Sequence, residues 1–143
     1  MIALSDSDEP VKAALHECLQ ARAKRRVRTA FLWVHVIGNH GQVHFYPTER
    51  TNIQSPPDEM LGDTIWHIAD VPGWDDEEME FTLQDGTVRY AEDAEERQRI
   101  LAAHVEAVVR TALAELLSEI QPDRVAVHSE WGEFASEWNN KAV

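Results

Sequence analysis

The chain has 143 residues and a net charge of −13, from 26 acidic against 13 basic residues. This balance disfavours nonspecific nucleic-acid binding, because most of the surface would repel phosphates. A hydrophobic share of 43% with five tryptophans predicts one folded domain over residues 1–143, and the one cysteine excludes an intramolecular disulfide.

The cellular location follows from the same features. The N-terminus is acidic, and no stretch approaches the ~20 apolar residues of a membrane span. A lone cysteine fits a reducing compartment. We therefore expect a cytoplasmic protein that does not bind membranes.

The first predicted helix begins near Ser7 or Asp8, either of which can cap it, with Pro10 tolerated in the first turn. Apolar residues then follow helical spacing along one side, at Val11, Ala14, Leu15, Cys18 and Leu19. A basic cluster from Arg22 to Arg28 closes this helix, where cations suit the negative end of the helix dipole.

Residues 31–47 predict a hairpin, because two runs rich in β-branched and aromatic residues flank a glycine-bounded turn. With Asn39-His40 as the turn, side-chain alternation separates two faces. One face is apolar and should be core: Leu32, Val34, Val36, Val43 and Phe45. The other is aromatic and half polar, which predicts a ligand-binding face: Trp33, His35, His44 and Tyr46.

The pairing of His35 with His44 also raises a metal-binding interpretation, because opposed residues lie about 4.5–5.5 Å apart at Cβ. Zinc usually takes three or four ligands, and the sequence has no spaced Cys/His set. The favoured interpretation is therefore that these histidines pack beside Trp33 and Tyr46. We expect no metal and no cofactor.

A second predicted helix begins at Ser55, followed by two prolines and early acids. Its apolar side would consist of Met60, Leu61, Ile65 and Ile68. The alternative is a short strand from Thr64 to Ala69.

The most acidic stretch runs from Asp70 to Glu96, where eleven acidic residues face one basic residue, Arg89. An aromatic side chain surrounded by charge is common at protein interfaces. We therefore predict a partner-binding site at the densest part of this stretch: Trp74, Asp75, Asp76, Glu77 and Glu78. The alternatives are a tryptophan tucked under the sheet and acids that serve only solubility.

A second hairpin is predicted from 79 to 91 around the favoured turn Asp85-Gly86. In that register Phe81 faces Tyr90 and Leu83 faces Val88. The predicted core face therefore consists of Met79, Phe81, Leu83, Val88 and Tyr90.

The longest predicted helix is capped by Asp93 and runs to about Gln121. Its apolar residues recur every four positions, so the stripe winds around the 3.6-residue helix. This leaves the segment from Leu113 to Ile120 as a candidate homodimer contact, unless the tail covers it. A further strand is predicted from Arg124 to His128, and a short helix in the tail with Phe134 and Trp138 on one side.

Together these elements predict an α+β fold, with an antiparallel sheet of four to five strands packed against three to four helices. The sequence has no nucleophile motif and no glycine-rich phosphate loop, so we expect no enzyme. In size, charge and tryptophan content the chain resembles small bacterial immunity or inhibitor proteins that block basic toxins. This resemblance implies a non-catalytic, acidic module with a basic protein partner. The alternatives are a small-ligand or metal-binding protein that uses the first hairpin, and an oligomeric scaffold.

Overall fold

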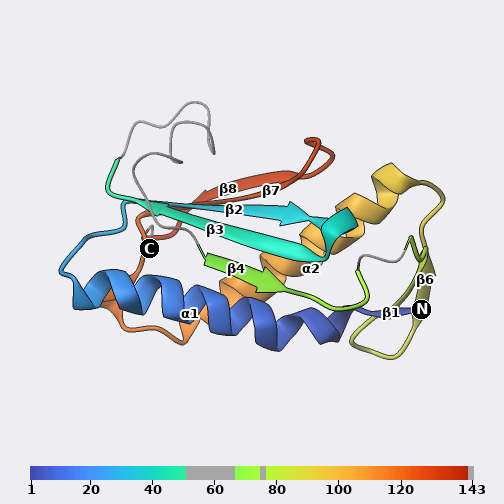
Figure 1. The fold of residues 1–143 in the computed structure, drawn as a ribbon, viewed down its shortest axis with the longest axis horizontal. Coiled ribbons are helices and arrows are strands. Elements are labelled where there is room, and N and C mark those ends of the chain that lie inside the picture. The colour runs from blue at the N-terminus through green and yellow to red at the C-terminus, as the bar shows by residue number, and fades with distance from the viewer. Residues whose placement is uncertain (51–66, 75–76, 142–143) are drawn as a thin grey trace.

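The computed structural model describes residues 1–50, 67–74 and 77–141. Over these residues the fold is α+β, with two α-helices and two sheets (Figure 1). The longer elements run in the order β1 (Ile2–Ala3), α1 (Asp8–Lys24), β2 (Phe31–Ile37), β3 (Gln42–Thr48), β4 (His67–Asp70), β5 (Glu80–Thr82), β6 (Val88–Tyr90), α2 (Ala94–Ala114), β7 (Arg124–Ser129) and β8 (Ala135–Asn139). Short 3-10 turns lie at Leu4–Ser7, Gly38–His40 and Ser118–Ile120.

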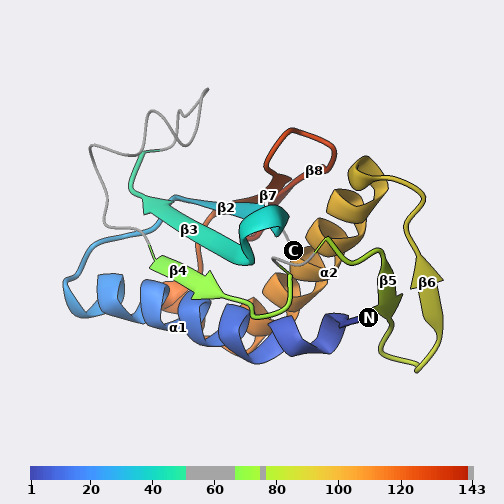
Figure 2. The same cartoon turned by 45° about the vertical axis from the view of Figure 1, so that its right-hand side comes forward.

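The larger sheet has the strand order β4-β3-β2-β7-β8. The helices α1 and α2 cover one of its faces (Figures 1 and 2). The core-facing side chains of the sheet are fully or almost fully buried, at Leu32, Val34, Val36, Val43, Phe45, Ala69, Val125 and Val127. The opposite face of the sheet carries half-buried side chains, among them Trp33, His35 and His128.

The predicted antiparallel sheet was wrong in two places. Strand β7 runs parallel to β2, because the chain returns to the sheet through the helix α2 rather than through a tight turn. A second, three-stranded sheet has the order β1-β5-β6, with β1 parallel to β5. The predicted three to four helices become two α-helices among the described residues.

The helix α1 has the predicted start and buried stripe but not the predicted cap, because the Ser7 hydroxyl donates to the carbonyl of Leu4 instead. It begins at Asp8 and ends at Lys24, and its stripe of Val11, Ala14, Leu15, Cys18 and Leu19 is buried against the sheet. Burial raises the pKa of the Cys18 thiol to about 12, so this cysteine is a packing residue.

The first hairpin also has the predicted register. Trp33 pairs with Tyr46 and His35 pairs with His44, with the turn closed by Gly41 in the left-handed region at φ 61°. Gly38 must stay small, because a Cβ there would lie 2.5 Å from Gln98 Oε1. The hairpin turn therefore packs directly against α2.

The segment between the two hairpins ends in a strand. Residues 67–70 form β4, which pairs with β3, so the predicted helix does not extend to Ile68. The rest of that predicted helix, from Ser55 to residue 66, lies outside the described residues.

The second hairpin departs from the prediction by one residue. Phe81 pairs with Arg89 rather than Tyr90, and the amide of Leu83 donates to the carbonyl of Thr87 at 2.8 Å. The loop therefore holds three residues, with Gly86 at φ 85°. As a result, Phe81 is buried while Val88 and Tyr90 face outward.

The helix α2 begins as predicted and ends earlier. The Asp93 side chain caps it by accepting from the Glu96 amide at 2.8 Å. It ends at Ala114, where the Gln121 side-chain amide donates to the carbonyls of Leu113 and Leu116. Leu113 is buried and Leu117 is 66% exposed, so the continuous helical stripe proposed as a dimer contact is absent.

The tail forms the strand β8 instead of the predicted helix, and pairs with β7. The four-residue spacing of Phe134 and Trp138 suits one side of a strand as well as one side of a helix. Both side chains pack against the core, and the Arg110 guanidinium lies 3.8 Å from the ring centre of Trp138. Among the described residues, no helix is both long enough and apolar enough to span a membrane.

Candidate functional site

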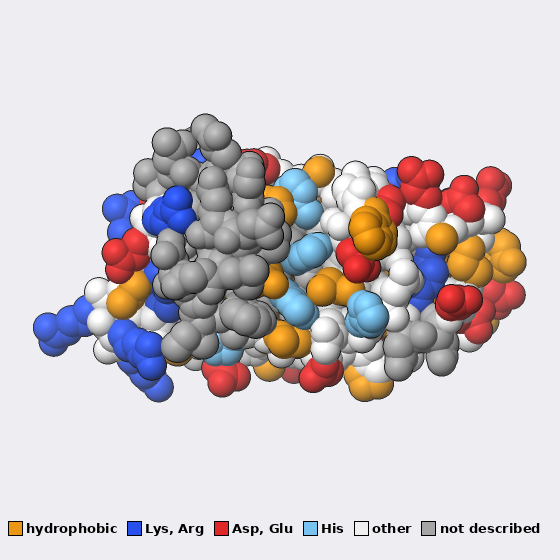
Figure 3. Space-filling view, turned by 45° about the horizontal axis from the view of Figure 1, so that its top comes forward, with side chains coloured by type: hydrophobic (Ala, Val, Ile, Leu, Met, Phe, Trp, Pro, Cys, Tyr) orange, Lys and Arg blue, Asp and Glu red, His pale blue; other side chains and the backbone are white. Residues whose placement is uncertain are grey.

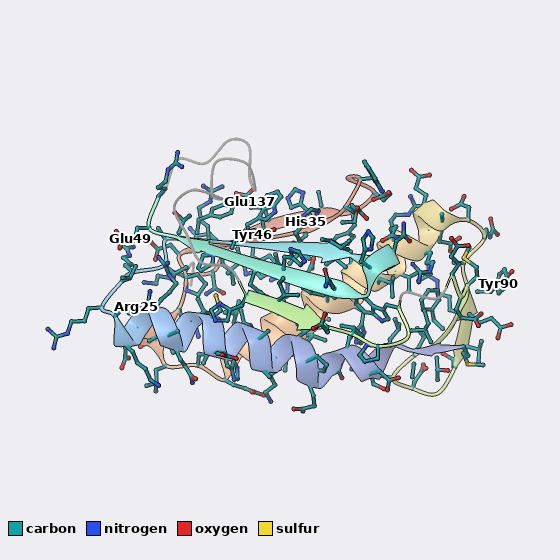
Figure 4. The ribbon with its side chains drawn as sticks, in the orientation of Figure 1. Arg25, His35, Tyr46, Glu49, Tyr90 and Glu137 are labelled. Atoms are coloured by element: carbon teal, nitrogen blue, oxygen red, sulfur yellow. The ribbon has the colours of Figure 1, made fainter. Side chains whose placement is uncertain are left out.

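The face of the larger sheet opposite the two α-helices carries a row of three histidines. His44, His35 and His128 lie in register on β3, β2 and β7. The ring of His128 stacks on Trp33, with ring centres 4.0 Å apart. We call His35, His44 and His128, together with Trp33 and Tyr46, the histidine face; Figure 3 shows histidines gathered over the middle of the molecule, and Figure 4 shows His35 and Tyr46 on the side of the sheet away from α1.

Hydrogen bonds fix the orientation of the His44 ring. Its Nε2–H donates to Gln42 Oε1 at 3.1 Å, because that oxygen can only accept. Its Nδ1 lies 3.0 Å from the Tyr46 hydroxyl, which can donate to a neutral ring or accept from a charged one. The two contacts therefore hold the ring in place in either protonation state.

Burial lowers the pKa of all three histidines. For His44 and His128 the second cause is repulsion from His35, while the Glu130 carboxylate partly opposes the pKa decrease at His35. Tyr46 is buried at 5% exposure, and this burial raises the pKa of its hydroxyl. Near neutral pH the face is thus uncharged and aromatic, suited to stacking and to neutral hydrogen bonds.

The row of three histidines does not support the metal-binding interpretation. Strands lie about 4.8 Å apart, so the outer histidines are roughly twice that distance from each other, whereas zinc ligands lie about 2.1 Å from the ion. Over residues 1–50, 67–74 and 77–141, no group of three or more His, Cys, Asp or Glu side chains could hold a metal ion.

The predicted acidic partner site is only partly brought together. Trp74 is fully buried, so it belongs to the core and cannot anchor a partner in this structure. Glu77 is exposed, and Glu78 is half-buried. The pKa of Glu78 is lowered, chiefly by its hydrogen bond from the Met1 amino group. Asp75 and Asp76 lie outside the described residues.

A buried arginine ties this acidic region to the rest of the protein. Arg97, at 3% exposure, donates to the carbonyls of Trp74 and Glu78 and to Asn39 Oδ1 in the turn of the first hairpin. Burial lowers its pKa, and the Glu77 carboxylate opposes that change. The guanidinium therefore fixes the loop below the acids against α2.

An exposed apolar surface lies at the same end of the molecule, on the outer side of the three-stranded sheet. Met1, Val88 and Tyr90 are 62%, 58% and 63% exposed there. Acidic residues accompany them on β5, in the hairpin turn and after β6: Glu80, Asp85 and Glu92. We call these six residues the small-sheet face; acidic side chains gather at this end in Figure 3, and Tyr90 projects from it in Figure 4.

Two features of these surfaces were missed from the sequence. His128 was predicted only as the end of a strand, and the parallel pairing of β7 with β2 places it beside His35. Val88 and Tyr90 were assigned to the core because a two-residue turn was assumed. Gly86 also suits the last position of a three-residue loop, and that alternative turn would have predicted Val88 and Tyr90 to face outward.

None of the family models, curated protein sequences or solved structures compared with this chain matches it.

Proposed function

We propose that the protein is a non-catalytic, acidic protein-binding module that holds a basic partner, in the manner of small bacterial immunity and inhibitor proteins. The observation that carries the proposal is the outward position of Tyr90 and Val88 on an acidic surface. Tyrosine is among the residues most often found at the energetic centre of protein interfaces.

The composition of the small-sheet face fits such an interface. Three of the six exposed large hydrophobic side chains of the described chain lie on it, beside Glu80, Asp85 and Glu92. An apolar centre with a charged rim gives affinity at the centre and orientation at the rim. This surface thus replaces Trp74 as the proposed anchor, while the acidic region proposed from the sequence stays part of the site.

The negative charge around the small-sheet face favours a basic partner. Hydrogen bonds from the Thr87 hydroxyl and amide hold the pKa of Asp85 below its usual range, so it stays ionised. The basic residues Lys24, Arg25 and Arg26 lie at the opposite end of the molecule, where α1 ends and Arg25 is labelled (Figure 4). A basic partner would be steered toward the small-sheet face, with an association rate that falls as salt rises.

The test compares two exposed aromatic residues. Wild type, Tyr90→Ser and the matched control Trp131→Ser, 75% exposed and far along the chain, would each be used to capture partners from the cells of origin. We expect wild type and Trp131→Ser to retain the same basic protein. Tyr90→Ser should bind it about tenfold or more weakly, since interface tyrosines commonly contribute more than about 1.4 kcal/mol. Equal binding by Tyr90→Ser would reject the proposal.

A second candidate function is small-ligand binding by the histidine face. The stacking of His128 on Trp33 favours it, because it extends the aromatic surface to a third strand. A titration with small aromatic compounds, followed by the NMR signals of the imidazoles, would test it. Binding should be lost in His35→Ala, and wild-type imidazole signals that no compound shifts would reject this function.

A further inference from the structure

The backbone of β6 offers unpaired hydrogen-bonding groups beside its exposed side chains. In the antiparallel pair β5–β6, Leu83 bonds to Thr87 and Ala91 bonds to Met79. Because bonded and non-bonded pairs alternate, the pairs Thr82–Val88 and Glu80–Tyr90 are the non-bonded ones. The amides and carbonyls of Val88 and Tyr90 therefore point away from β5.

That side of β6 is a free edge. Within the described part of the chain, the small sheet has the order β1-β5-β6, so no strand follows β6 (Figure 2). An exposed edge is a template for another strand unless charge, proline or a bulge protects it. The strand Val88–Tyr90 has no proline, and its one charged residue, Arg89, is engaged by Glu96 at 3.4 Å.

The charges around this edge select what can pair with it. Asp85 lies before the strand and Glu92 after it, both exposed. A second copy of this chain would bring the same acids to the same edge, and like charges directly opposite each other destabilise a strand pair. A strand with basic residues at its ends would be attracted instead.

We propose that β6 receives an extended, lysine- or arginine-ended segment of the basic partner as a fourth strand of the small sheet. This inference rests on the proposed function and specifies its binding mode. Strand addition gives affinity through main-chain hydrogen bonds and specificity through alternate side chains.

The two sides of the added strand would meet different surroundings. Residues opposite Val88 and Tyr90 would lie on the outer side, against the apolar small-sheet face. The residue opposite Arg89 would point to the inner side, where Arg89, Leu83, Ile100 and Phe134 line an open groove of about 470 Å³. The segment should therefore be apolar at alternate positions between its basic ends.

The test uses a synthetic peptide of alternating valine and threonine between lysine ends, and a twin that is N-methylated at the residues facing β6. The twin keeps the charge and the side chains but cannot donate main-chain hydrogen bonds. The readout is amide hydrogen exchange at Val88 and Tyr90, with Arg89 as the internal control because its amide faces β5 in this register.

We expect the unmethylated peptide to slow exchange at Val88 and Tyr90 by about tenfold or more, with little change at Arg89. The twin should bind about tenfold more weakly, for the loss of hydrogen bonds worth about 1 kcal/mol each. Equal binding of both peptides without protection would reject strand addition while leaving a basic partner on the small-sheet face in place. Binding of neither peptide would reject the added strand. The proposed function would still be decided by the capture experiment with Tyr90→Ser. Protection that rises with protein concentration alone would also reject it, in favour of a second copy.

Discussion

The two hairpins of this protein differ by one loop residue, and that residue determines which side chains reach solvent. In β2–β3 four residues separate the closing pair Ile37–Gln42, which is the pair that a two-residue turn at Asn39-His40 also gives. In β5–β6 three residues separate Leu83 from Thr87. Because side chains alternate along a strand, an even change in loop length preserves the faces and an odd change exchanges them.

This difference separates two kinds of surface. The hairpin β2–β3 lies within a five-stranded sheet and keeps Trp33 half-buried and Tyr46 buried at 5% exposure, with Trp33 and His128 stacked and His44 bonded on both nitrogens. The hairpin β5–β6 sits at the end of the molecule and leaves Tyr90 63% exposed on an edge strand. The first surface is built like a rigid site, and the second like a docking edge.

The largest expected effect on stability is the difference between alanine variants at Phe81, which is buried, and at Tyr90, which is exposed. Phe81→Ala should lower the free energy of unfolding by about 3–5 kcal/mol, because Phe81 is fully buried. Tyr90→Ala should change it by about 0.5 kcal/mol or less. Urea unfolding of both variants would check this, and a large loss from Tyr90→Ala would mean that the two-residue register is the correct one.

The second-largest effect on stability is expected at Arg97, which connects the two regions. Arg97→Met removes the donor to the carbonyls of Trp74 and Glu78 and to Asn39 in the first turn. We expect a loss of about 2–3 kcal/mol, because buried acceptors are left without partners. The control Arg99→Met removes only an exposed pair with Glu95 at 3.8 Å and should cost about 0.5 kcal/mol or less. Similar thermal stability of the two variants would contradict the bridging role of Arg97.

The histidine face should make the free energy of unfolding depend on pH near neutrality. The folded-state pKa values of His35, His44 and His128 lie below the ordinary value of 6.5. As pH falls below 6.5 the unfolded state therefore binds protons first, and stability decreases until the lowered pKa values are passed. Urea unfolding at about pH 7.5 and about pH 5.5 should show this decrease, and His35→Asn should reduce it. An unchanged pH dependence in that variant would exclude the His35 imidazole as a source.

The smallest expected effect on stability comes from a change that tests the length of the β5–β6 loop directly. Deleting Gln84 leaves Asp85-Gly86 as a two-residue turn between the same pair, Leu83 and Thr87. The register and the outward position of Tyr90 should then be unchanged, with little loss of stability. Backbone NMR shifts of β5 and β6 would check this, and an inward Tyr90 would contradict the three-residue loop.

Local patterns in the sequence were sufficient for α1, the first hairpin and the start of α2. In each case a cap, a glycine-bounded turn or a helical stripe determines the element from nearby residues alone. The tail was misassigned because the spacing of Phe134 and Trp138 suits both a helix and a strand, and pairing with β7 decides between them. The parallel placement of β7 depends on contacts distant in sequence, so the position of His128 could not be derived from local patterns.

The candidate site was predictable to a similar degree. Trp33, His35, His44 and Tyr46 do share a face, because their order follows from one correctly counted register. Trp74 was placed on the surface because its acidic neighbours in sequence dominated the argument, although its side chain packs into the core. The exposed anchor, Tyr90, depended on one loop residue that the favoured Asp-Gly turn concealed.

The most direct test of the account compares the two surfaces in one experiment. A photo-crosslinking amino acid, p-benzoylphenylalanine, would replace Tyr90 on the small-sheet face or Ile68, which is 43% exposed beside His44 on the larger sheet. The account predicts a crosslink in the cells of origin from position 90 to a basic protein, weakened by high salt. A crosslink from position 68 with none from position 90 would contradict it.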